Sequence, residues 1–415
     1  MDDVRTLIVG AGQAGLALSR YLTRMGHRHV LIERGRIGER WRSERWDSMA
    51  LLTPNWMSRL PGSAPHPDPD GFSGKDDFAA YLDRYARSFR APVRERVSVL
   101  DVSEERAGDG FRVRTDSGDW HAGNVVVASG YADEPLVPAV AAAAPRWLLQ
   151  LHSSGYRSVA QLPPGGVLVV GAGPSGQQIA AELRRAGRDV VIAVGRHARM
   201  PRRYRGRDVW RWFAANGSLD QTLDDVPRER GASRSPSLVL TGARGGEELD
   251  LAVLTEAGVV VTGRLRGWSG RHALFAGDLA ASVEESEQRM RRVLAKIDRN
   301  VEATDDRDVS SAEPVAPVTL HRAPPMLDLA EAEIATVIWA TGYRRSYPWL
   351  SVDTFGEDGE ISHSRGITAV PGLYALGLRF QHRRSSHFIA GVGEDARFLA
   401  QHIAAAPAAR VAAAG

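Results

Sequence analysis

The chain has 415 residues, no cysteine, 53 basic and 50 acidic residues, and a formal net charge of +3 at pH 7. The length predicts two or three domains. The lack of cysteine excludes disulfides, thiolate metal sites and thiol-dependent disulfide reductases, and we expect no metal site. Because the charges nearly balance, we expect no nucleic-acid partner. No apolar run approaches the ~20 residues of a membrane span, so we expect a cytoplasmic protein without membrane contact.

A glycine-rich turn joins the first predicted strand, at 6–9, to an amphipathic helix at 13–25. Its spacing is Gly-x-Gly-x-x-Gly, carried by Gly10, Gly12, Gln13, Ala14 and Gly15. The first glycine permits the tight turn, the second lets backbone approach a pyrophosphate, and the third lets the helix pack closely. The next strand, 29–32, ends on Glu33, where a carboxylate accepts hydrogen bonds from an adenosine ribose. We therefore predict an FAD site at this turn.

A strand-rich stretch completes the first predicted unit. A helix at 76–89 is followed by strands at 96–102, 111–115 and 120–128. The proline- and alanine-rich segment 134–145 then has the composition of a linker.

A second glycine turn follows a buried strand at 167–170 and opens a helix at 175–186. It is carried by Gly171, Gly173, Pro174, Ser175 and Gly176. The next strand, 189–194, ends without an acid and is followed by basic residues: Arg196, His197, Arg199, Arg202 and Arg203. Guanidinium groups suit a 2′-phosphate better than a ribose hydroxyl. We therefore predict an NADPH site here.

The later elements suggest a nested chain. A charged helix at 279–303 and a polar segment at 305–311 precede two apolar strands, 335–340 and 373–376, which we expect to return to the first sheet. The predicted fold class is α/β, with two Rossmann-like dinucleotide-binding domains and the NADPH domain inserted within the FAD domain. The predicted bounds are 1–155 with 320–405 for the FAD domain, 160–318 for the NADPH domain, and 406–415 for a flexible tail.

Together these motifs resemble the class B flavin-containing monooxygenases, and the resemblance covers nearly the whole chain. Segments 125–130 and 337–343 resemble the two crossings between domains, the second containing the family motif Ala340, Thr341 and Gly342. His152 and Tyr156 resemble the second half of the family fingerprint. The first half departs from it, because Arg146 and Leu148 stand where phenylalanine and glycine are expected. A tyrosine four residues after the histidine favours heteroatom oxygenation over Baeyer–Villiger chemistry.

The resemblance also implies individual site residues. Segment 38–42, with Arg40 and Trp41, resembles the stretch along the flavin ring, although Trp41 also suits a core position. Segment 52–56 resembles the stretch whose asparagine, Asn55, faces the flavin C4a, although Pro-Asn is also ordinary turn chemistry. Further cofactor contacts are implied at Arg34, Val97, Ala128 and Gln381. The N-terminus of the final helix, at 391–395, is expected to face the flavin pyrimidine carbonyls, whose negative charge grows on reduction. His382, in the loop before it, suits a solvent-facing position.

The implied activity is that of an NADPH-dependent monooxygenase. In the family, NADPH reduces FAD, O₂ forms a C4a-hydroperoxyflavin, and oxygen passes to a nucleophilic nitrogen or sulfur of a small molecule. The alternatives are a Baeyer–Villiger monooxygenase, an NADPH oxidase or dehydrogenase without oxygen insertion, and a nucleotide-sensing regulator. We expect a monomer or homodimer, and the sequence does not reveal the substrate.

Overall fold

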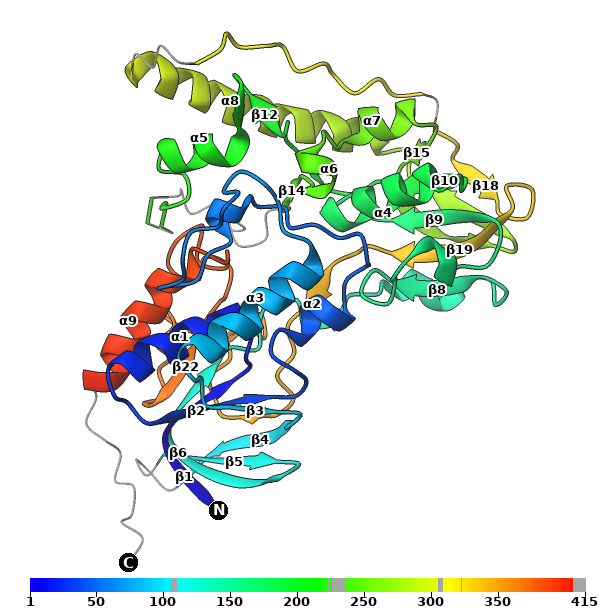
Figure 1. Ribbon diagram of the computed structural model, residues 1–415. Helices are drawn as coiled ribbons and strands as arrows, with labels where there is room; N and C mark the ends of the chain where they lie inside the picture. Colours follow the sequence, from blue (N-terminus) through cyan, green and yellow to red (C-terminus); the bar gives the residue numbers. More distant parts are fainter. Residues whose placement is uncertain (106–109, 223, 226–235, 305–308, 322, 406–415) are drawn as a thin grey trace, which may run out of the picture.

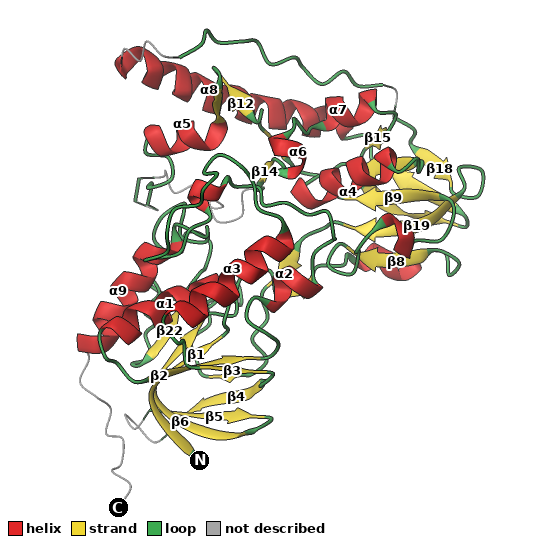
Figure 2. Ribbon diagram, in the orientation of Figure 1, coloured by secondary structure: helices red, strands yellow, loops and turns green. Residues whose placement is uncertain are grey.

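Two sheets with parallel strands, each covered by helices, form this α/β protein, and the chain of the second is inserted within that of the first (Figure 1, Figure 2). The computed structural model describes residues 1–105, 110–222, 224–225, 236–304, 309–321 and 323–405. The predicted tail at 406–415 and most of the polar segment 305–311 lie outside these ranges. Within them, no helix is both long and apolar enough to cross a membrane.

The first sheet has the strand order β21-β4-β5-β6-β1-β2-β3, with β22 also paired to β6. Strands β1, β2, β3, β6 and β22 run parallel, whereas β4 and β5 form an antiparallel meander with β6. The bounds are β1 (Asp2–Val9), β2 (His29–Glu33), β3 (Val93–Glu95), β4 (Val99–Glu104), β5 (Phe111–Thr115), β6 (Gly118–Val127), β21 (Leu350–Ser351) and β22 (Leu373–Ala375).

Helices cover one face of this sheet. They are α1 (Gln13–Arg24), α3 (Lys75–Ser88) and α9 (Val392–Ala405), with the short α2 (Glu39–Ser43) beside α3 (Figure 1). Their apolar sides form one buried cluster, in which Leu16 of α1 and Leu399 of α9 are fully buried. Burial of such side chains stabilises the fold by about 1.5–3 kcal/mol each. Because β1, β6 and β22 run parallel, their carboxyl ends lie at the same end of the sheet.

The second sheet is entirely parallel, with the order β15-β10-β9-β19-β8. Its strands are β8 (Leu149–His152), β9 (Gly166–Val170), β10 (Val190–Ala193), β15 (Val260–Thr262) and β19 (Ile334–Trp339). Every residue of β9 is buried, as expected for a strand covered on both faces. Helices α4 (Pro174–Arg185) and α7 (Leu251–Glu256) contribute to the buried cluster on one face. A three-stranded antiparallel sheet belongs to the cluster on the other: β16 (Leu265–Ser269), β17 (His272–Phe275) and β18 (Met326–Asp328).

A third group of elements lies above both sheets in the view of Figure 1. The long helix α8 (Leu279–Thr304) and α5 (Val209–Ala215) share an aromatic-rich cluster that includes Trp212 and Met57. The remaining short elements are β7 (Glu134–Pro135), β11 (Ala198–Arg199), β12 (Arg203–Tyr204), β13 (Arg207–Asp208), β14 (Leu238–Val239), β20 (Tyr343–Arg344), α6 (Ala243–Gly246), η1 (Asn55–Met57), η2 (Ala139–Ala143) and η3 (Val159–Gln161).

Two strands belong to a different sheet from the one predicted. The segment 335–340 does not return to the first sheet, because β19 pairs with β9 and β8 at the centre of the second sheet. Strand β8 also lies in the second sheet, although the predicted division assigned it to the first domain. The strand at 373–376 does return, as β22 beside β6. The strand pairing therefore favours a second unit wider than 160–318, from about Leu149 to Gly342.

The helices predicted at 13–25, 76–89, 175–186 and 279–303 are confirmed, and the strand predicted at 96–102 begins only at Val99. Helices α1, α3, α4 and α8 lie where the hydrophobic patterns indicated. The strand predicted at 96–102 is interrupted at its start, because Arg96 has φ +59°. An arginine with a left-handed backbone conformation does not continue a strand. Strand β3 therefore ends before Arg96, and β4 begins after it.

Candidate functional site: two nucleotide turns and the loop of Asn55

The first glycine turn connects β1 to α1 and has a backbone that requires glycine. Gly10 has φ +108°, and a Cβ there would lie 2.6 Å from the carbonyl oxygen of Ala128. A Cβ on Gly15 would lie 2.0 Å from the carbonyl oxygen of Gly10, so the helix packs directly on the turn. A Cβ on Gly12 would meet nothing within 4 Å among the described residues. The close approaches thus fall at the first and third glycines, and open space lies beside the second.

The second turn connects β9 to α4 and repeats this geometry. Gly171 has φ +110°, and its Cβ would lie 2.5 Å from the carbonyl oxygen of Ala340. A Cβ on Gly176 would lie 1.9 Å from the Gly171 carbonyl oxygen, while one on Gly173 would meet no described atom within 4 Å. Ala340 therefore occupies the same position at the second turn as Ala128 does at the first. In each sheet, the carbonyl oxygen of the residue that follows the adjacent strand packs against the first glycine of the turn.

The helices that follow the turns begin without side-chain caps. Gln13 and Ala14 open α1, and Pro174 and Ser175 open α4. The N-cap residue is a glycine in both helices, so no side chain of the N-cap bonds to the first N–H groups. The first N–H groups of a helix have no partner inside it, and the helix dipole makes that end positive. An open glycine beside such an end is suited to a pyrophosphate. The residues present therefore fit a dinucleotide at each turn.

Glu33 connects the end of β2 to the first turn. Its Oε2 accepts a hydrogen bond from the Ala11 N–H at 2.8 Å, and its Oε1 accepts one from the Gly35 N–H at 2.9 Å. The Val97 N–H donates to the Glu33 carbonyl oxygen at 2.9 Å, so Val97 lies beside this strand end. A carboxylate oxygen accepts more than one hydrogen bond, so Glu33 retains the capacity to bind ribose hydroxyls.

The arginines predicted near the flavin are joined to acidic side chains. Arg40 pairs with Asp133, and Arg34 lies 3.6 Å from the same carboxylate. Trp41 on α2 is half-buried and meets the ring of Phe78 edge-on, with the centroids 4.9 Å apart. These contacts join α2 to α3 and to the loop after β6. They leave the predicted flavin contacts of Arg34, Arg40 and Trp41 as predictions.

Gln381 lies in the loop after β22 with 3% of its surface exposed. Its Oε1 accepts hydrogen bonds from the N–H groups of Gly377 at 2.9 Å and Leu378 at 3.3 Å. Its Nε2 is buried and has no hydrogen-bond partner among the described residues. A buried donor without a partner costs about 1–3 kcal/mol, and a cofactor carbonyl would satisfy it.

The basic residues after β10 fall into two groups. Arg196 is exposed at the strand end, where a 2′-phosphate is predicted, and His197 is buried with its Nδ1 3.1 Å from the Gly195 carbonyl oxygen. Burial lowers the pKa of His197. Arg264, which the sequence prediction missed, also lies at this strand end, since a Cβ on Gly195 would lie 3.5 Å from its Cγ; its exposed guanidinium pairs with Asp278 at 2.6 Å. An arginine two residues after the neighbouring strand β15 was the available signal.

Arg199 and Arg202 were wrongly grouped with these 2′-phosphate residues. Arg199 is buried and pairs with Asp250 at 2.7 Å and Glu287 at 2.8 Å. Arg202 is 1% exposed and pairs with Asp208 at 2.6 Å. Because a buried guanidinium needs an acidic partner, both groups are committed to internal ion pairs. The exposed Arg203 lies on the surface and donates to the carbonyl oxygens of residues 245–246.

The second crossing between the units, segment 337–343, is joined by hydrogen bonds to the end of β8 and to the linker 134–145. His152 at the end of β8 donates from Nε2 to the Gly342 carbonyl oxygen at 2.9 Å, while its Nδ1 accepts from the Ser154 N–H at 3.1 Å. Thr341 donates to the carbonyl oxygen of Leu136 in the connector. The fully buried Tyr156 donates to Glu182 of α4 at 2.7 Å. Burial lowers the pKa of His152, while burial and Glu182 raise that of Tyr156.

Asn55 is 4% exposed, and its side chain holds the loop at 66–73. Its Nδ2 donates to the Asp68 carbonyl oxygen at 2.9 Å and lies 3.2 Å from Nδ1 of His66. Its Oδ1 accepts from the Ser73 hydroxyl at 2.6 Å. Both donors are thus engaged and one lone pair of Oδ1 remains. The catalytic role of Asn55 remains a prediction. To accept a hydrogen bond it would use this lone pair, whereas to donate one it would require the longer contact, to His66, to open.

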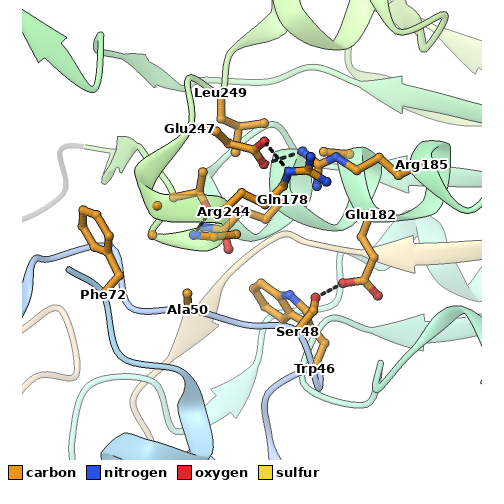
Figure 3. A pocket seen from close by; sticks show the side chains of 15 residues that line it. Trp46, Ser48, Ala50, Phe72, Gln178, Glu182, Arg185, Arg244, Glu247 and Leu249 are labelled. Atoms are coloured by element: carbon orange, nitrogen blue, oxygen red, sulfur yellow. Dashed lines mark hydrogen bonds and ion pairs between the residues drawn. The ribbon is translucent and has the colours of Figure 1, made fainter.

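A cavity of about 450 Å³ lies between the loop at 46–50 and the side of α4 (Figure 3). Its volume falls within the roughly 300–1,000 Å³ of small-molecule pockets. Its charged side chains have polar partners: Arg185 and Arg244 both contact Glu247, and Glu182 accepts a hydrogen bond from Ser48 (Figure 3). The cavity is lined by α4 beyond its first turn and is separate from the glycine turns.

Comparison with known proteins agrees with this geometry. A family model described as pyridine nucleotide-disulphide oxidoreductase matches residues 7–208. A CzcO-like oxidoreductase of Geobacillus kaustophilus is 32% identical over 403 residues, covering 96% of this chain and 98% of the relative. Indole-3-pyruvate monooxygenase YUCCA8 of Oryza sativa subsp. japonica is 32% identical over 418 residues, covering 96% and 90%.

Among solved structures, the flavin-containing monooxygenase from Stenotrophomonas maltophilia has a TM-score of 0.66 with 21% identity, covering 98% of this chain and 99% of that one. At this identity the likeness concerns the fold alone, and it supports the arrangement of two nucleotide-binding units. From the relatives above 30% identity over almost the whole chain, together with the two glycine turns, the protein belongs to the class B flavin-containing monooxygenase family.

Proposed function

We propose that the protein is an NADPH-dependent monooxygenase that oxygenates a nucleophilic nitrogen or sulfur of a small molecule. FAD and NADPH are the cofactors of its family, and the two glycine turns fit them. The observation that carries the proposal is the pairing of an open second glycine with an uncapped helix at both turns. Bound FAD supplies the chemistry, by taking a hydride from NADPH and activating O₂.

The chain's own residues bind and orient the cofactors in this proposal. The N-termini of α1 and α4 hold the two pyrophosphates, and Glu33 binds the adenosine ribose of FAD. The unpartnered Nε2 of Gln381 donates to a flavin carbonyl. Arg196, with Arg264 beside it, binds the 2′-phosphate that distinguishes NADPH from NADH. Asn55 orients the nicotinamide carboxamide through its remaining Oδ1 lone pair.

A second candidate is the oxygenation of a 2-oxo acid. It is favoured by one observation, the 32% identity to a protein named indole-3-pyruvate monooxygenase over 90% of that protein's length. Baeyer–Villiger chemistry is a third outcome of the same test. Cytoplasmic location and the monomeric or dimeric state remain predictions.

The test is product analysis with the purified holoenzyme. Amines, thioethers, cyclic ketones and 2-oxo acids are incubated with NADPH and O₂, and products are identified by mass spectrometry. An N-oxide or S-oxide supports the proposal. A decarboxylated product from a 2-oxo acid, or an ester from a ketone, would replace it. One H₂O₂ released for each NADPH consumed, with no oxygenated product, would make the protein an NADPH oxidase.

A further inference from the structure

The carbonyl oxygen of Leu52, three residues before Asn55, accepts hydrogen bonds from two side chains of the second unit. Nη1 of Arg202 donates to it at 2.8 Å, and Nε1 of Trp210 donates at 3.2 Å. A backbone carbonyl has two lone pairs, and both are used here. The segment that carries Asn55 is therefore attached to the part of the chain that follows the second glycine turn.

The guanidinium of Arg202 is itself held in place. Its Nε and Nη2 lie 2.8 and 2.6 Å from Oδ2 of Asp208. The other oxygen of Asp208 accepts from the Trp210 N–H at 2.8 Å and caps α5. One carboxylate thus orients both donors to Leu52. The planar guanidinium has five donors, so that of Arg202 bonds the Asp208 carboxylate on one side and the Leu52 carbonyl oxygen on the other.

The same guanidinium contacts the second segment around Asn55. It lies over the ring of Phe72, 4.3 Å from the centroid. Phe72 is flanked by Gly71, whose carbonyl oxygen accepts from the Asn55 N–H at 2.9 Å, and by Ser73, whose hydroxyl donates to Oδ1 of Asn55. One buried cation therefore touches both segments that hold Asn55.

We infer that Arg202 is a positioning residue that fixes the Asn55 loop relative to the NADPH-binding unit. The inference rests on the proposed function, in which Asn55 orients the nicotinamide. In the proposed function, NADPH is bound on the second unit and Asn55 lies on the first. Their relative placement therefore depends on contacts between the two units, such as those of Arg202 and Trp210 with Leu52. A misplacement of about 1 Å at a reacting centre costs up to roughly 100-fold in rate. Arg202 supplies a charged, rigid contact at this junction.

The decisive variant is Arg202→Lys, with Arg203→Lys as its matched control. Lysine retains the charge beside Asp208, but its single compact ammonium does not bond both Asp208 and the Leu52 carbonyl in the geometry of the fork. Arg203→Lys makes the same change one residue away, where the side chain is exposed and contacts the carbonyl oxygens of residues 245–246. Trp210→Phe removes the second bond to Leu52 and serves as an independent variant.

The first readout is amide hydrogen exchange, which does not depend on turnover. The N–H groups of Leu51, Asn55 and Trp56 bond to carbonyls of the facing segment 69–73, so their exchange reports the opening of this loop. We expect Arg202→Lys to accelerate exchange in the peptide 51–58 by roughly 10- to 100-fold, since a hydrogen bond to a charged donor is lost. Trp210→Phe should give a smaller acceleration, and Arg203→Lys none. Equal exchange in wild type and Arg202→Lys would overturn the inference.

The second readout separates positioning from general destabilisation. At saturating NADPH, we expect Arg202→Lys to lower the rate of flavin reduction about 10-fold while the Kd for NADP⁺ changes less than twofold. If Arg202 acts through Asn55, the double variant with Asn55→Ala should be no slower than the slower of the two single variants. Multiplicative effects would overturn the inference. A wild type that yields only H₂O₂ would refute the proposed monooxygenase activity, while the exchange measurement would still decide the role of Arg202.

Discussion

Gly12 offers a test of the first nucleotide site at the level of a single residue. Its φ of −82° and ψ of −170° are allowed for any residue, and a Cβ there would meet no described atom within 4 Å. Gly12→Val should therefore leave the fold intact but place a branched side chain in the path of the pyrophosphate. We expect a protein with normal circular dichroism that purifies without the yellow colour of FAD. Full flavin content in this variant would show that the pyrophosphate lies elsewhere.

Arg196 tests the preference for NADPH. A charge-assisted hydrogen bond is worth about 1.5–3 kcal/mol, so Arg196→Ala should raise the KM for NADPH by roughly 10- to 150-fold. The KM for NADH should hardly change, because NADH lacks the 2′-phosphate. Arg203→Ala removes an exposed arginine of the same segment and is the control. A wild type that uses both coenzymes equally well would contradict the assignment.

Asn55 requires a control because its side chain also holds a loop. Asn55→Ala should leave the NADPH Kd nearly normal and raise the H₂O₂ released per NADPH, since the amide acts near the reacting centre in the proposed function. Ser73→Ala removes only the 2.6 Å bond to Oδ1 and keeps the amide. Peroxide release measured in both variants distinguishes the roles. The same increase in both would assign Asn55 to loop structure alone.

At the scale of elements, the sequence predicted strands and helices better than it predicted their neighbours. Hydrophobic period and glycine spacing correctly located α1, β2, α4 and β10, because these signals are local. They did not reveal the sheet to which β19 belongs, since buried parallel strands are apolar on both faces in either sheet. The pairing is decided by contact with β9 and by the approach of Ala340 to Gly171, which are 169 positions apart in the chain.

The candidate site was predictable to the same extent. Glycines report a backbone requirement and can be recognised from spacing alone, as Gly10 and Gly171 illustrate. Spacing does not distinguish an arginine that binds phosphate from one in an internal ion pair. The role of Arg199 depends on Glu287, which is distant in sequence, and the role of Arg202 depends on its burial. The hydrogen bonds of Asn55 to the loop at 66–73 were equally invisible in the sequence.

The junction of β8 and β19 is the element whose disruption we expect to affect coenzyme retention. His152→Ala removes the 2.9 Å bond to the Gly342 carbonyl oxygen and the edge contact with the ring of Tyr343. A hydrogen bond contributes about 0.5–1.5 kcal/mol, so we expect the NADP⁺ Kd to rise roughly 2- to 10-fold, with more peroxide released. Calorimetric titration with NADP⁺ measures the first effect, and His152→Gln should partly restore it. Unchanged affinity in the alanine variant would limit His152 to a local structural role.

For the whole molecule, the two units are joined by more than the chain connections. Arg202 and Trp210 of the second unit donate to the carbonyl oxygen of Leu52, and Ser48 of the first unit donates to Glu182 of α4. Contacts made by the buried side chains of Arg202 and Trp210 favour a fixed relative placement of the units over free hinge motion. The hydride transfer of the proposed function would require such placement, and this would offset the desolvation cost of burying Arg202 between the units.

The stability of the whole molecule should depend on pH in a direction set by its buried and half-buried histidines. Burial lowers the pKa of the seven histidines His27, His29, His152, His197, His363, His382 and His387, that of His387 to about 3. A histidine takes up a proton near pH 6.5 in the unfolded chain, whereas these resist protonation in the folded protein. Above pH 6.5 these histidines are neutral in both states and do not reduce the free energy of unfolding. As the pH falls below 6.5, the unfolded chain binds protons that the folded protein does not, so the free energy of unfolding decreases.

For His387 alone, the free energy of unfolding should fall by about 1.4 kcal/mol per pH unit below pH 6.5. Urea denaturation at pH 7.5, 6.5 and 5.5, with FAD in excess, measures this slope. Glu39, whose pKa is lowered to about 2 mainly by its hydrogen bond from Arg36, loses its contribution only below pH 4.5, so it does not enter this window. His387→Gln should reduce the slope by the His387 share. A free energy of unfolding that stays constant from pH 7.5 to 5.5 would mean that these rings are protonated without cost in the folded protein.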